Sequence, residues 1–289
     1  MRGIILAGGS GTRLHPMTIG VSKQLLPVFD KPMIYYPLST MIFSGIREIL
    51  IISNPEHLAA YENLLGSGED WGMHFEYKAQ DRPRGLADAF IVGEDFIRGE
   101  PVSLMLGDNI LYGSGMVDKL QRSALITSGA VIFAYQVKDP QRFGIVELAA
   151  DQKAISLEEK PANPKSNYAV PGIYFYDGNV VEYAKSLKPS QRGEIEITDL
   201  NRIYLERREL LVETLGRGVA WLDAGTPEAL LQAANFIQTV QERQGFMISC
   251  PEEIAMRMGF ITREQLGQVV KKLKNPDYAR YLREIINEP

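Results

Sequence analysis

The sequence predicts an α/β protein in which a mostly parallel sheet carries helices on both faces. Short apolar runs alternate with stretches of helical periodicity through the first 140 residues, and this alternation is typical of consecutive β-α-β units. The first apolar run, Ile4 to Ala7, ends directly in a glycine-rich loop, and open parallel sheets bind ligands at that end of their strands. We therefore expect a twisted, Rossmann-like sheet.

Each element of the first half follows from its own pattern. Apolar runs bounded by glycine, proline or charged residues predict strands, at residues 3–8, 47–53, 74–80, 102–108 and 130–137. Between them, apolar residues at helical spacing predict helices, at residues 32–45, 55–68, 85–99 and 115–129. Pro37 is expected to kink the first of these helices or to start it again, because proline has no backbone N–H.

The pattern changes after about residue 140. The sequence then predicts a β-hairpin, a strand, a helix and two further strands, at residues 144–161, 169–177, 197–210, 210–215 and 219–225. Thr226 with Pro227 predicts the start of a helix that ends at Gly245, and Thr262 with Gln265 has the spacing of a capping box. We expect one α/β domain over residues 1–240 and a helical extension over residues 241–289.

Composition excludes several classes of function. The formal net charge of −5 over 289 residues argues against nucleic acid as the main partner, because nucleic-acid-binding surfaces are basic. No apolar run approaches the roughly 18 residues of a membrane helix, and the N-terminus enters a strand without the layout of a signal peptide. The single cysteine, Cys250, cannot form an internal disulfide and is expected to pack in the core. These features predict a cytoplasmic protein that binds neither nucleic acid nor membrane.

The segment LAGGSGTRL joins the first strand to a glycine loop. Neither standard phosphate-binding pattern fits, because no lysine follows Gly11 as in a P-loop and Leu14 stands where the dinucleotide fingerprint needs its third glycine. Glycines still let backbone N–H groups approach phosphate oxygens, and Arg13 adds a guanidinium that can bind two of them. Lys23 supplies a second cation. These residues predict a triphosphate site, although alone the loop could be a plain turn with both cations solvated.

Two aspartates follow apolar strands in the same way. Asp108 ends the run LMLGD and Asp223 ends the run VAWLD, and each alone could be a loop cap. Together they suit magnesium, which proteins usually hold through one or two carboxylates while phosphates and water complete the shell. The three histidines lack metal-ligand spacing, so neither a zinc site nor a Ser-His-Asp triad is expected. We predict that Asp108 and Asp223 bind Mg²⁺.

The motif LAGGSGTRLHPMT, followed by SKQLLPVFDKPMIYYPLS, resembles the nucleotidyltransferases that activate sugar 1-phosphates. Within that family it is most similar to the glucose-1-phosphate thymidylyltransferases of the short, rhamnose-pathway type. Every fixed position of the pattern G-G-x-G-T-R-L-x-P-x-T is matched, and so are the motifs L-G-D-N and W-L-D-x-G-T that carry the family's metal-binding aspartates. The resemblance continues in pieces to the C-terminus.

This resemblance implies a reaction. An oxygen of glucose 1-phosphate would attack the α-phosphorus of dTTP in line, and dTDP-glucose and pyrophosphate would form. The attacking phosphate is already ionised at neutral pH, so no general base is required. Arg13 would stabilise charge on the triphosphate, Lys23 would hold the β and γ groups, and Mg²⁺ would bridge toward the α-phosphate.

The resemblance also implies which residues hold each substrate. The motif E-E-K-P assigns Glu159 to the glucose ring and Lys160 to the sugar phosphate, although adjacent strand residues face opposite ways and a solvated charge pair is the plainer interpretation. The other expected sugar-binding residues, within or beside a β-rich part at roughly 140–225, are Asn109, Gly144, Val170, Tyr174 and Trp221. A core role is nearly as well supported for the last two. The expected nucleotide-binding residues are Gly8, Gly9, Ser10, Gly11, Thr12, Gln80 and Gly85, with the Gln80 amide at the pyrimidine edge.

Two further features of the chain follow from the same comparison. Phe143 stands where many relatives carry tyrosine, so a hydroxyl contact to the sugar at this position is in doubt. The segment CPEEIAMRMGFI resembles the family's subunit-contact region and regulatory nucleotide site. Feedback by dTDP-rhamnose through Glu253 and Arg257 is therefore a hypothesis, as is a homotetramer, although the two side chains could simply form an intrahelical ion pair.

Two alternatives stay open. Thymine and uracil differ by one methyl group, which discriminates by only about 1–3 kcal/mol, so UTP could replace dTTP in the same chemistry. A nucleotide-sugar sensor that lost turnover is a second alternative, but such a protein tends to lose a metal carboxylate or the loop cation. Arg13, Lys23, Asp108 and Asp223 are all intact.

Overall fold

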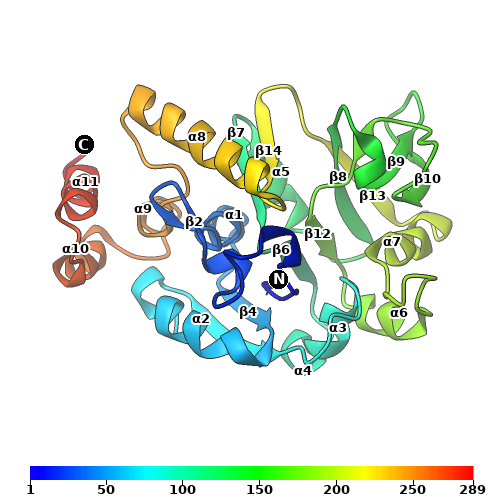
Figure 1. Cartoon of the computed structure of the whole chain (residues 1–289), viewed down its shortest axis with the longest axis horizontal. Coiled ribbons are helices and arrows are strands. Elements are labelled where there is room, and N and C mark those ends of the chain that lie inside the picture. Colours follow the sequence, from blue (N-terminus) through cyan, green and yellow to red (C-terminus); the bar gives the residue numbers. More distant parts are fainter. Residues whose placement is uncertain (289) are drawn as a thin grey trace.

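A computed structural model describes residues 1–288, and a single large sheet lies at its centre (Figure 1). The strands of this sheet are β1 (Arg2–Leu6), β4 (Glu48–Ser53), β5 (His74–Ala79), β6 (Val102–Leu106), β8 (Ala130–Gln136), β9 (Gly144–Leu148), β10 (Ala154–Glu159), β11 (Tyr168–Ala169), β12 (Ile173–Tyr176) and β13 (Leu210–Thr214). Their order is β10-β9-β11-β8-β12-β6-β1-β4-β5, and β13 also pairs with β8.

The strands nearest the N-terminus form the parallel part that the sequence predicts. β1 runs parallel to β4 and β6, and its Ile5 is paired with Ile51 on one side and Met105 on the other. β12 is antiparallel to both β6 and β8, which makes the sheet mixed. The predicted hairpin is confirmed as the antiparallel pair β9 and β10. The sheet is therefore parallel in its first half and antiparallel toward the hairpin, apart from β13, which is parallel to β8.

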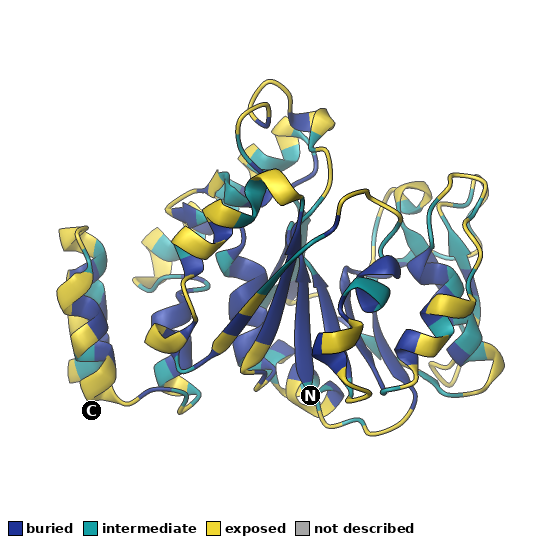
Figure 2. Cartoon of the chain, turned by 90° about the horizontal axis from the view of Figure 1, so that it is seen from below, coloured by how far each residue is buried: buried dark blue, intermediate teal, exposed yellow. Residues whose placement is uncertain are grey.

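Helices cover both faces of the sheet. They are α1 (Tyr35–Phe43), α2 (Leu58–Leu65), α3 (Asp88–Val92), α4 (Glu94–Ile97), α5 (Met116–Ser123), α6 (Val180–Ser186), α7 (Ile197–Glu206), α8 (Pro227–Gln244), α9 (Pro251–Arg257), α10 (Arg263–Lys272) and α11 (Pro276–Asn287). Successive strand residues point to opposite faces, so Ile5 packs in the core shared with α1, α2 and α9, whereas Ile4 packs in the core shared with α3, α6 and α7. Figure 2 shows the buried strands between helices whose outer sides are exposed.

Several predicted boundaries were wrong, each for a local reason. The helix expected at 85–99 is broken at Gly93 into α3 and α4. The strand expected at 169–177 is interrupted at Pro171, between β11 and β12. Pro37 neither kinks nor restarts α1, because it lies in the first turn, where a helical N–H has no intrahelical partner. Helix α6 was not predicted.

Two small sheets were also not predicted. β2 (Pro27–Val28) pairs with β3 (Lys31–Pro32), and β7 (Asn109–Gly113) pairs antiparallel with β14 (Val219–Asp223). The second pair joins segments about a hundred residues apart and fixes where Asp108 and Asp223 lie. No local pattern in the sequence specifies such a long-range pairing.

The C-terminal helices agree with their predicted signals. The Thr226 side chain accepts a hydrogen bond from the backbone N–H of Ala229, and Gly245 ends α8 in a left-handed conformation. Thr262 and Gln265 form the predicted capping box of α10. The helices α10 and α11 lie at the end of the molecule opposite β9 and β10 (Figure 1). Within residues 1–288, none of the helices combines the length and apolar character needed to cross a bilayer.

Candidate active site

The glycine loop follows β1 and borders a small cavity. This cavity has a volume of about 220 Å³, and its lining includes the predicted nucleotide-binding residues Gly8, Gly9, Ser10, Gly11 and Thr12 together with Arg13, Lys23 and Asp108. Gly11 has a φ of 59° and precedes a short turn of helix at Thr12–Leu14. The hydroxyl of Thr18 donates to the carbonyl of Gly11 at 2.7 Å, so the loop is held from outside the cavity.

Lys23 and Asp108 meet at the same cavity. The Lys23 ammonium lies 2.5 Å from Oδ2 of Asp108, and both side chains are largely buried. Burial would raise the pKa of the Asp108 carboxyl, but the Lys23 ammonium and hydrogen bonds from Lys23 and Asn109 outweigh it and lower that pKa. Asp108 is therefore ionised at neutral pH and ready to bind a cation.

Asp223 is brought to this point by the pairing of β14 with β7. In that register Asp223 lies opposite Asn109, the neighbour of Asp108. Burial and the negative charge of Asp108 raise the pKa of Asp223, which is the expected result when two carboxylates share one site. Gly225 makes room beside it, since a Cβ there would lie 3.0 Å from Oδ1 of Asp223 and 3.1 Å from Nη2 of Arg13.

The two carboxylates fit a divalent cation. Hard cations prefer oxygen ligands, and Mg²⁺ needs one or two carboxylates when phosphates and water supply the rest. Among residues 1–288 there is no group of three or more His, Cys, Asp or Glu side chains that could hold a metal ion. Asp108 and Asp223 would thus bind the ion only partly, and the remaining ligands would come from substrate and water. A cation between them would also relieve the repulsion that raises the pKa of Asp223.

A larger cavity adjoins the aspartates on the side of the hairpin. It has a volume of about 470 Å³, and its lining includes all of the predicted sugar-binding residues: Asn109, Gly144, Glu159, Lys160, Val170, Tyr174 and Trp221. Arg13, Asp108 and Asp223 line the same cavity. The structure therefore brings the predicted metal-binding and sugar-binding residues to one continuous site.

Glu159 and Lys160 both line this cavity, so the expectation that they face opposite ways was wrong. β10 ends at Glu159, and Lys160 adopts a positive φ of 43°, which breaks the alternation of a strand. The Lys160 ammonium lies 3.5 Å from Oε1 of Glu159. Oε2 of Glu159 accepts a hydrogen bond of 2.5 Å from the hydroxyl of Thr198. The Lys160 side chain is 46% exposed, so its ammonium is accessible to an anion although it is paired with Glu159.

Three residues of the cavity wall have polar groups that are already hydrogen-bonded or buried: Asn109, Trp221 and Tyr174. The indole N–H of Trp221 donates to Oδ1 of Asn109 at 2.7 Å, and the backbone N–H of Gly172 donates to the same oxygen at 2.9 Å. Tyr174 is almost fully buried, and burial together with the nearby charge of Glu159 raises its pKa far above the usual range. The side chains of Asn109 and Trp221 hold each other in place at the edge of the cavity.

Two arginines at this site were missed in the sequence. Arg192 lines the larger cavity and lies 3.6 Å from Oε1 of Glu159 and 3.7 Å from Oε1 of Glu196. Arg142 also lines it, with Nη2 3.6 Å from Oδ2 of Asp223. Both lie in charged loop segments with no local signal of a role. Both guanidiniums are paired with carboxylates, Arg192 most closely with Glu194 at 2.6 Å and Arg142 with Asp139 at 2.9 Å, so they balance negative charge at the site.

Of the two predicted base-binding residues outside the glycine loop, Gln80 lies beside that loop and Gly85 packs against Ile195. Gln80 follows β5 directly and is 7% exposed. Its Oε1 is 3.7 Å from the position that a Cβ on Gly8 would occupy. Gly85 has a φ of 103°, and a Cβ there would lie 2.4 Å from the carbonyl oxygen of Ile195, so only glycine fits this close approach. Neither Gln80 nor Gly85 lines the two cavities described above.

Comparison with known proteins agrees with the family that the motifs indicate. Residues 2–240 match the model of the family described as nucleotidyl transferase. The chain belongs to the nucleotidyl transferase family. It is 56% identical to the glucose-1-phosphate thymidylyltransferase of Mycolicibacterium smegmatis over 99% of both chains, and 55% identical to that of Neisseria meningitidis over the whole of both.

Solved structures agree with this assignment. A putative glucose-1-phosphate thymidylyltransferase from Bacillus anthracis, in complex with a sucrose, superposes with a TM-score of 0.74 at 42% identity and covers 82% of this chain and 94% of its own. A UDP-glucose pyrophosphorylase complexed with UDP-glucose has a TM-score of 0.73 at 24% identity, which supports the fold alone. The predicted family and the predicted fold class are both confirmed.

The predicted regulatory residues of this nucleotidyl transferase lie away from the two cavities. The Arg257 Nε donates to Oε1 of Glu253 at 2.7 Å within α9, and its Nη2 donates to Oε2 of Glu288 at 2.6 Å. The intrahelical ion pair that the spacing allows is therefore present. Cys250 is fully buried, as expected, with its Sγ 3.2 Å from the hydroxyl of Tyr278.

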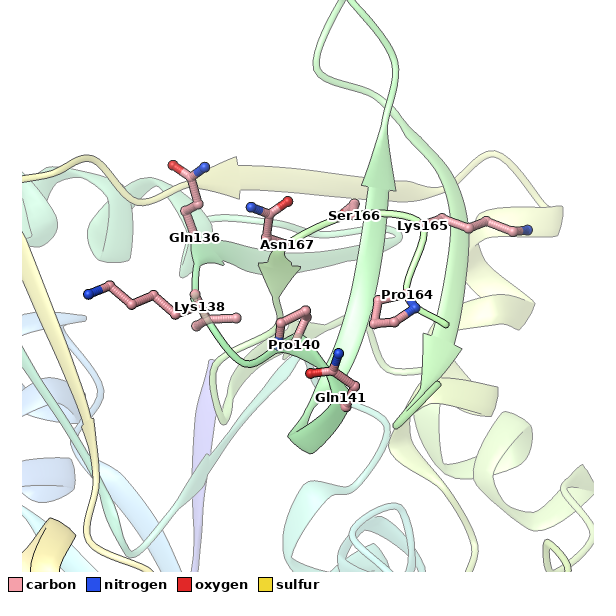
Figure 3. A pocket seen from close by; sticks show the side chains of 9 residues that line it. Gln136, Lys138, Pro140, Gln141, Pro164, Lys165, Ser166 and Asn167 are labelled. Carbon is pink, nitrogen blue, oxygen red and sulfur yellow. The ribbon is translucent and has the colours of Figure 1, made fainter. Parts of the chain in front are cut away.

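A separate hollow of the nucleotidyl transferase lies between the loops at residues 136–141 and 164–167 (Figure 3). It has a volume of about 650 Å³ and contains none of the predicted site residues. The side chains of Lys138 and Lys165 extend in opposite directions from it (Figure 3). Because their ammonium groups do not converge, this hollow lacks the paired cations of the glycine-loop site.

Proposed function

We propose that this nucleotidyl transferase transfers a thymidylyl group from dTTP to glucose 1-phosphate and forms dTDP-glucose and pyrophosphate. The observation that carries the proposal is one continuous site in which Arg13, Lys23 and the two aspartates adjoin Glu159 and Lys160. Curated relatives at 54–56% identity that carry the name glucose-1-phosphate thymidylyltransferase support it.

The sugar phosphate is positioned by cations at the larger cavity. Lys160 and Arg192 would bind its phosphate oxygens, since both are basic side chains that line the cavity. Glu159 would accept hydrogen bonds from glucose hydroxyls through the oxygen that does not bond to Thr198. A phosphate monoester is ionised at neutral pH, so the site needs no general base, and alignment with charge neutralisation supplies the catalysis.

The triphosphate is held by the glycine loop. Backbone N–H groups of this loop would contact phosphate oxygens, as nests of glycine residues do. Arg13 would bind oxygens at the α-phosphorus, where negative charge develops, and Lys23 would hold the β and γ groups. Mg²⁺ bound at Asp108 and Asp223 would neutralise phosphate charge and activate the α-phosphorus toward attack.

The proposal extends to the organisation of the protein. Residues 1–240 form the catalytic domain, with its sugar-binding part at roughly 140–225, and residues 241–289 form the helical extension. We place Glu253 and Arg257 in a regulatory site for dTDP-rhamnose and expect a cytoplasmic homotetramer that feeds deoxysugar synthesis. The support for these points is the resemblance of the motifs and the full-length similarity to the thymidylyltransferases.

A comparison of two nucleotides tests the proposed function. Pyrophosphate release is measured with glucose 1-phosphate and Mg²⁺, with dTTP or UTP as the second substrate. We expect kcat/KM to favour dTTP by about tenfold, which is what one methyl group in an apolar contact can supply. Equal or better use of UTP would contradict the thymidylyl assignment, and no release with either nucleotide from a folded protein would favour a sensor.

A further inference from the structure

The side-chain amide of Gln80 is bonded to a buried carboxylate. Its Nε2 donates to Oδ2 of Asp88 at 2.7 Å, and Asp88 is 0% exposed. Arg84 binds the same carboxylate, with its Nε donating to Oδ2 at 3.2 Å and its Nη2 3.1 Å from Oδ1. Asp88 is therefore a charged group enclosed by one amide and one guanidinium.

This arrangement fixes which end of the amide faces the glycine loop. An ionised carboxylate can only accept hydrogen bonds, so the –NH₂ end of Gln80 must point toward Asp88. The carbonyl end, Oε1, then points the other way, and it lies 3.7 Å from the Cβ position of Gly8 in the glycine loop. A flipped amide would place Oε1 against the carboxylate, which two acceptors in a buried site do not tolerate.

We propose that Asp88 is a positioning residue that locks the Gln80 amide so that a hydrogen-bond acceptor faces the nucleobase. Thymine and uracil present an N–H donor at ring position N3, whereas cytosine presents a lone pair there. The locked carbonyl would accept from the first group and repel the second. Asp88 thus selects keto pyrimidines through Gln80 without touching the base. This inference rests on the proposed function, in which Gln80 reads the base.

A purely structural role for Asp88 is the competing explanation. Asp88 opens the short helix α3, where an acidic side chain is favourable. Its Oδ2 accepts from Gln80 and Arg84 rather than from a backbone N–H of that helix, however, and within residues 1–288 its Oδ1 has no hydrogen-bond partner. A structural role would change stability alone, whereas a positioning role must also change which base is bound.

Asp88→Leu and Asp88→Asn form a matched pair, since both remove the charge and only asparagine keeps an acceptor. Binding of dTTP and of dCTP is measured by calorimetry with Mg²⁺ for each variant and for the unchanged protein. We expect the unchanged protein and Asp88→Asn to prefer dTTP by about tenfold or more, and Asp88→Leu to lose most of this preference. In turnover assays the loss should appear in KM for dTTP rather than in kcat.

A double variant covers the case in which Asp88→Leu does not fold. Arg84→Met with Asp88→Asn removes the charge pair without leaving a lone charge, and it also removes the N–H group that orients the asparagine oxygen. This variant should prefer dTTP less than Asp88→Asn alone. A folded Asp88→Leu or double variant with the full preference for dTTP would overturn the positioning role. If the unchanged protein itself does not bind dTTP, the proposed function fails instead.

Discussion

Asp108→Asn is expected to lower kcat for dTDP-glucose formation about 10²–10³-fold, the range typical of removing one preorganised charge at a reacting centre. The substitution keeps the size of the side chain but removes a carboxylate that would bind Mg²⁺, and it also removes the ion pair with Lys23. Steady-state assays with saturating dTTP and glucose 1-phosphate measure the loss. Raising the Mg²⁺ concentration should restore part of the rate, because the weakened site still has Asp223.

Asp95→Asn is the matched control for this substitution. Asp95 is 91% exposed at the side chain and pairs with Lys78 at 3.3 Å, so the activity of the Asp95→Asn variant should equal that of the unchanged protein. Comparable kcat values for Asp108→Asn and Asp95→Asn, in proteins with the same melting temperature, would contradict a catalytic role for Asp108.

Arg13→Lys is expected to lower kcat about 10²-fold although the charge is kept, an effect close to that of losing one transition-state donor. Arginine presents a planar fork to two oxygens, whereas lysine is a point charge. Arg13 lines both cavities. Its Nη2 lies 3.1 Å from the position that a Cβ on Gly225 would occupy. The KM for dTTP should change less than kcat, because the contact strengthens as pyrophosphate departs.

Arg122→Lys serves as the control for Arg13→Lys. Arg122 lies on α5 and pairs with Glu213 at 3.4 Å, outside both cavities of the active site. The same conservative change there should leave kcat within about twofold, since exposed ion pairs contribute little. If Arg13→Lys behaves like Arg122→Lys, the guanidinium of Arg13 does not act on the reacting phosphate.

The parts of the site that are continuous in the sequence were predictable. The glycine loop follows an apolar run, and the run itself predicts β1. The position of Arg13 at the carboxyl end of a parallel strand could therefore be predicted without knowledge of any distant contact. The same reasoning placed Asp108 after β6. Local patterns are sufficient here because the end of one buried strand determines where each loop begins.

The parts that depend on distant pairing were not predictable. The sequence showed two aspartates after strands, but only the β7–β14 pairing, with Asp223 opposite Asn109, shows why they meet. Lys160 turns into the cavity because of its positive φ, which a strand pattern does not reveal. Arg192 reaches Glu159 from a loop that follows α6. Each of these depends on the three-dimensional path of the chain rather than on spacing.

We propose that the sugar phosphate attacks the α-phosphorus of dTTP at this site. Glucose 1-phosphate labelled with ¹⁸O at its nonbridging phosphate oxygens tests it, with the products examined by ³¹P NMR. We expect all of the label in dTDP-glucose, with an isotope shift on the α-phosphorus from the new bridging oxygen, and unlabelled pyrophosphate. Formation of dTDP in place of pyrophosphate, or an α-phosphorus without the isotope shift, would show attack elsewhere and contradict the account.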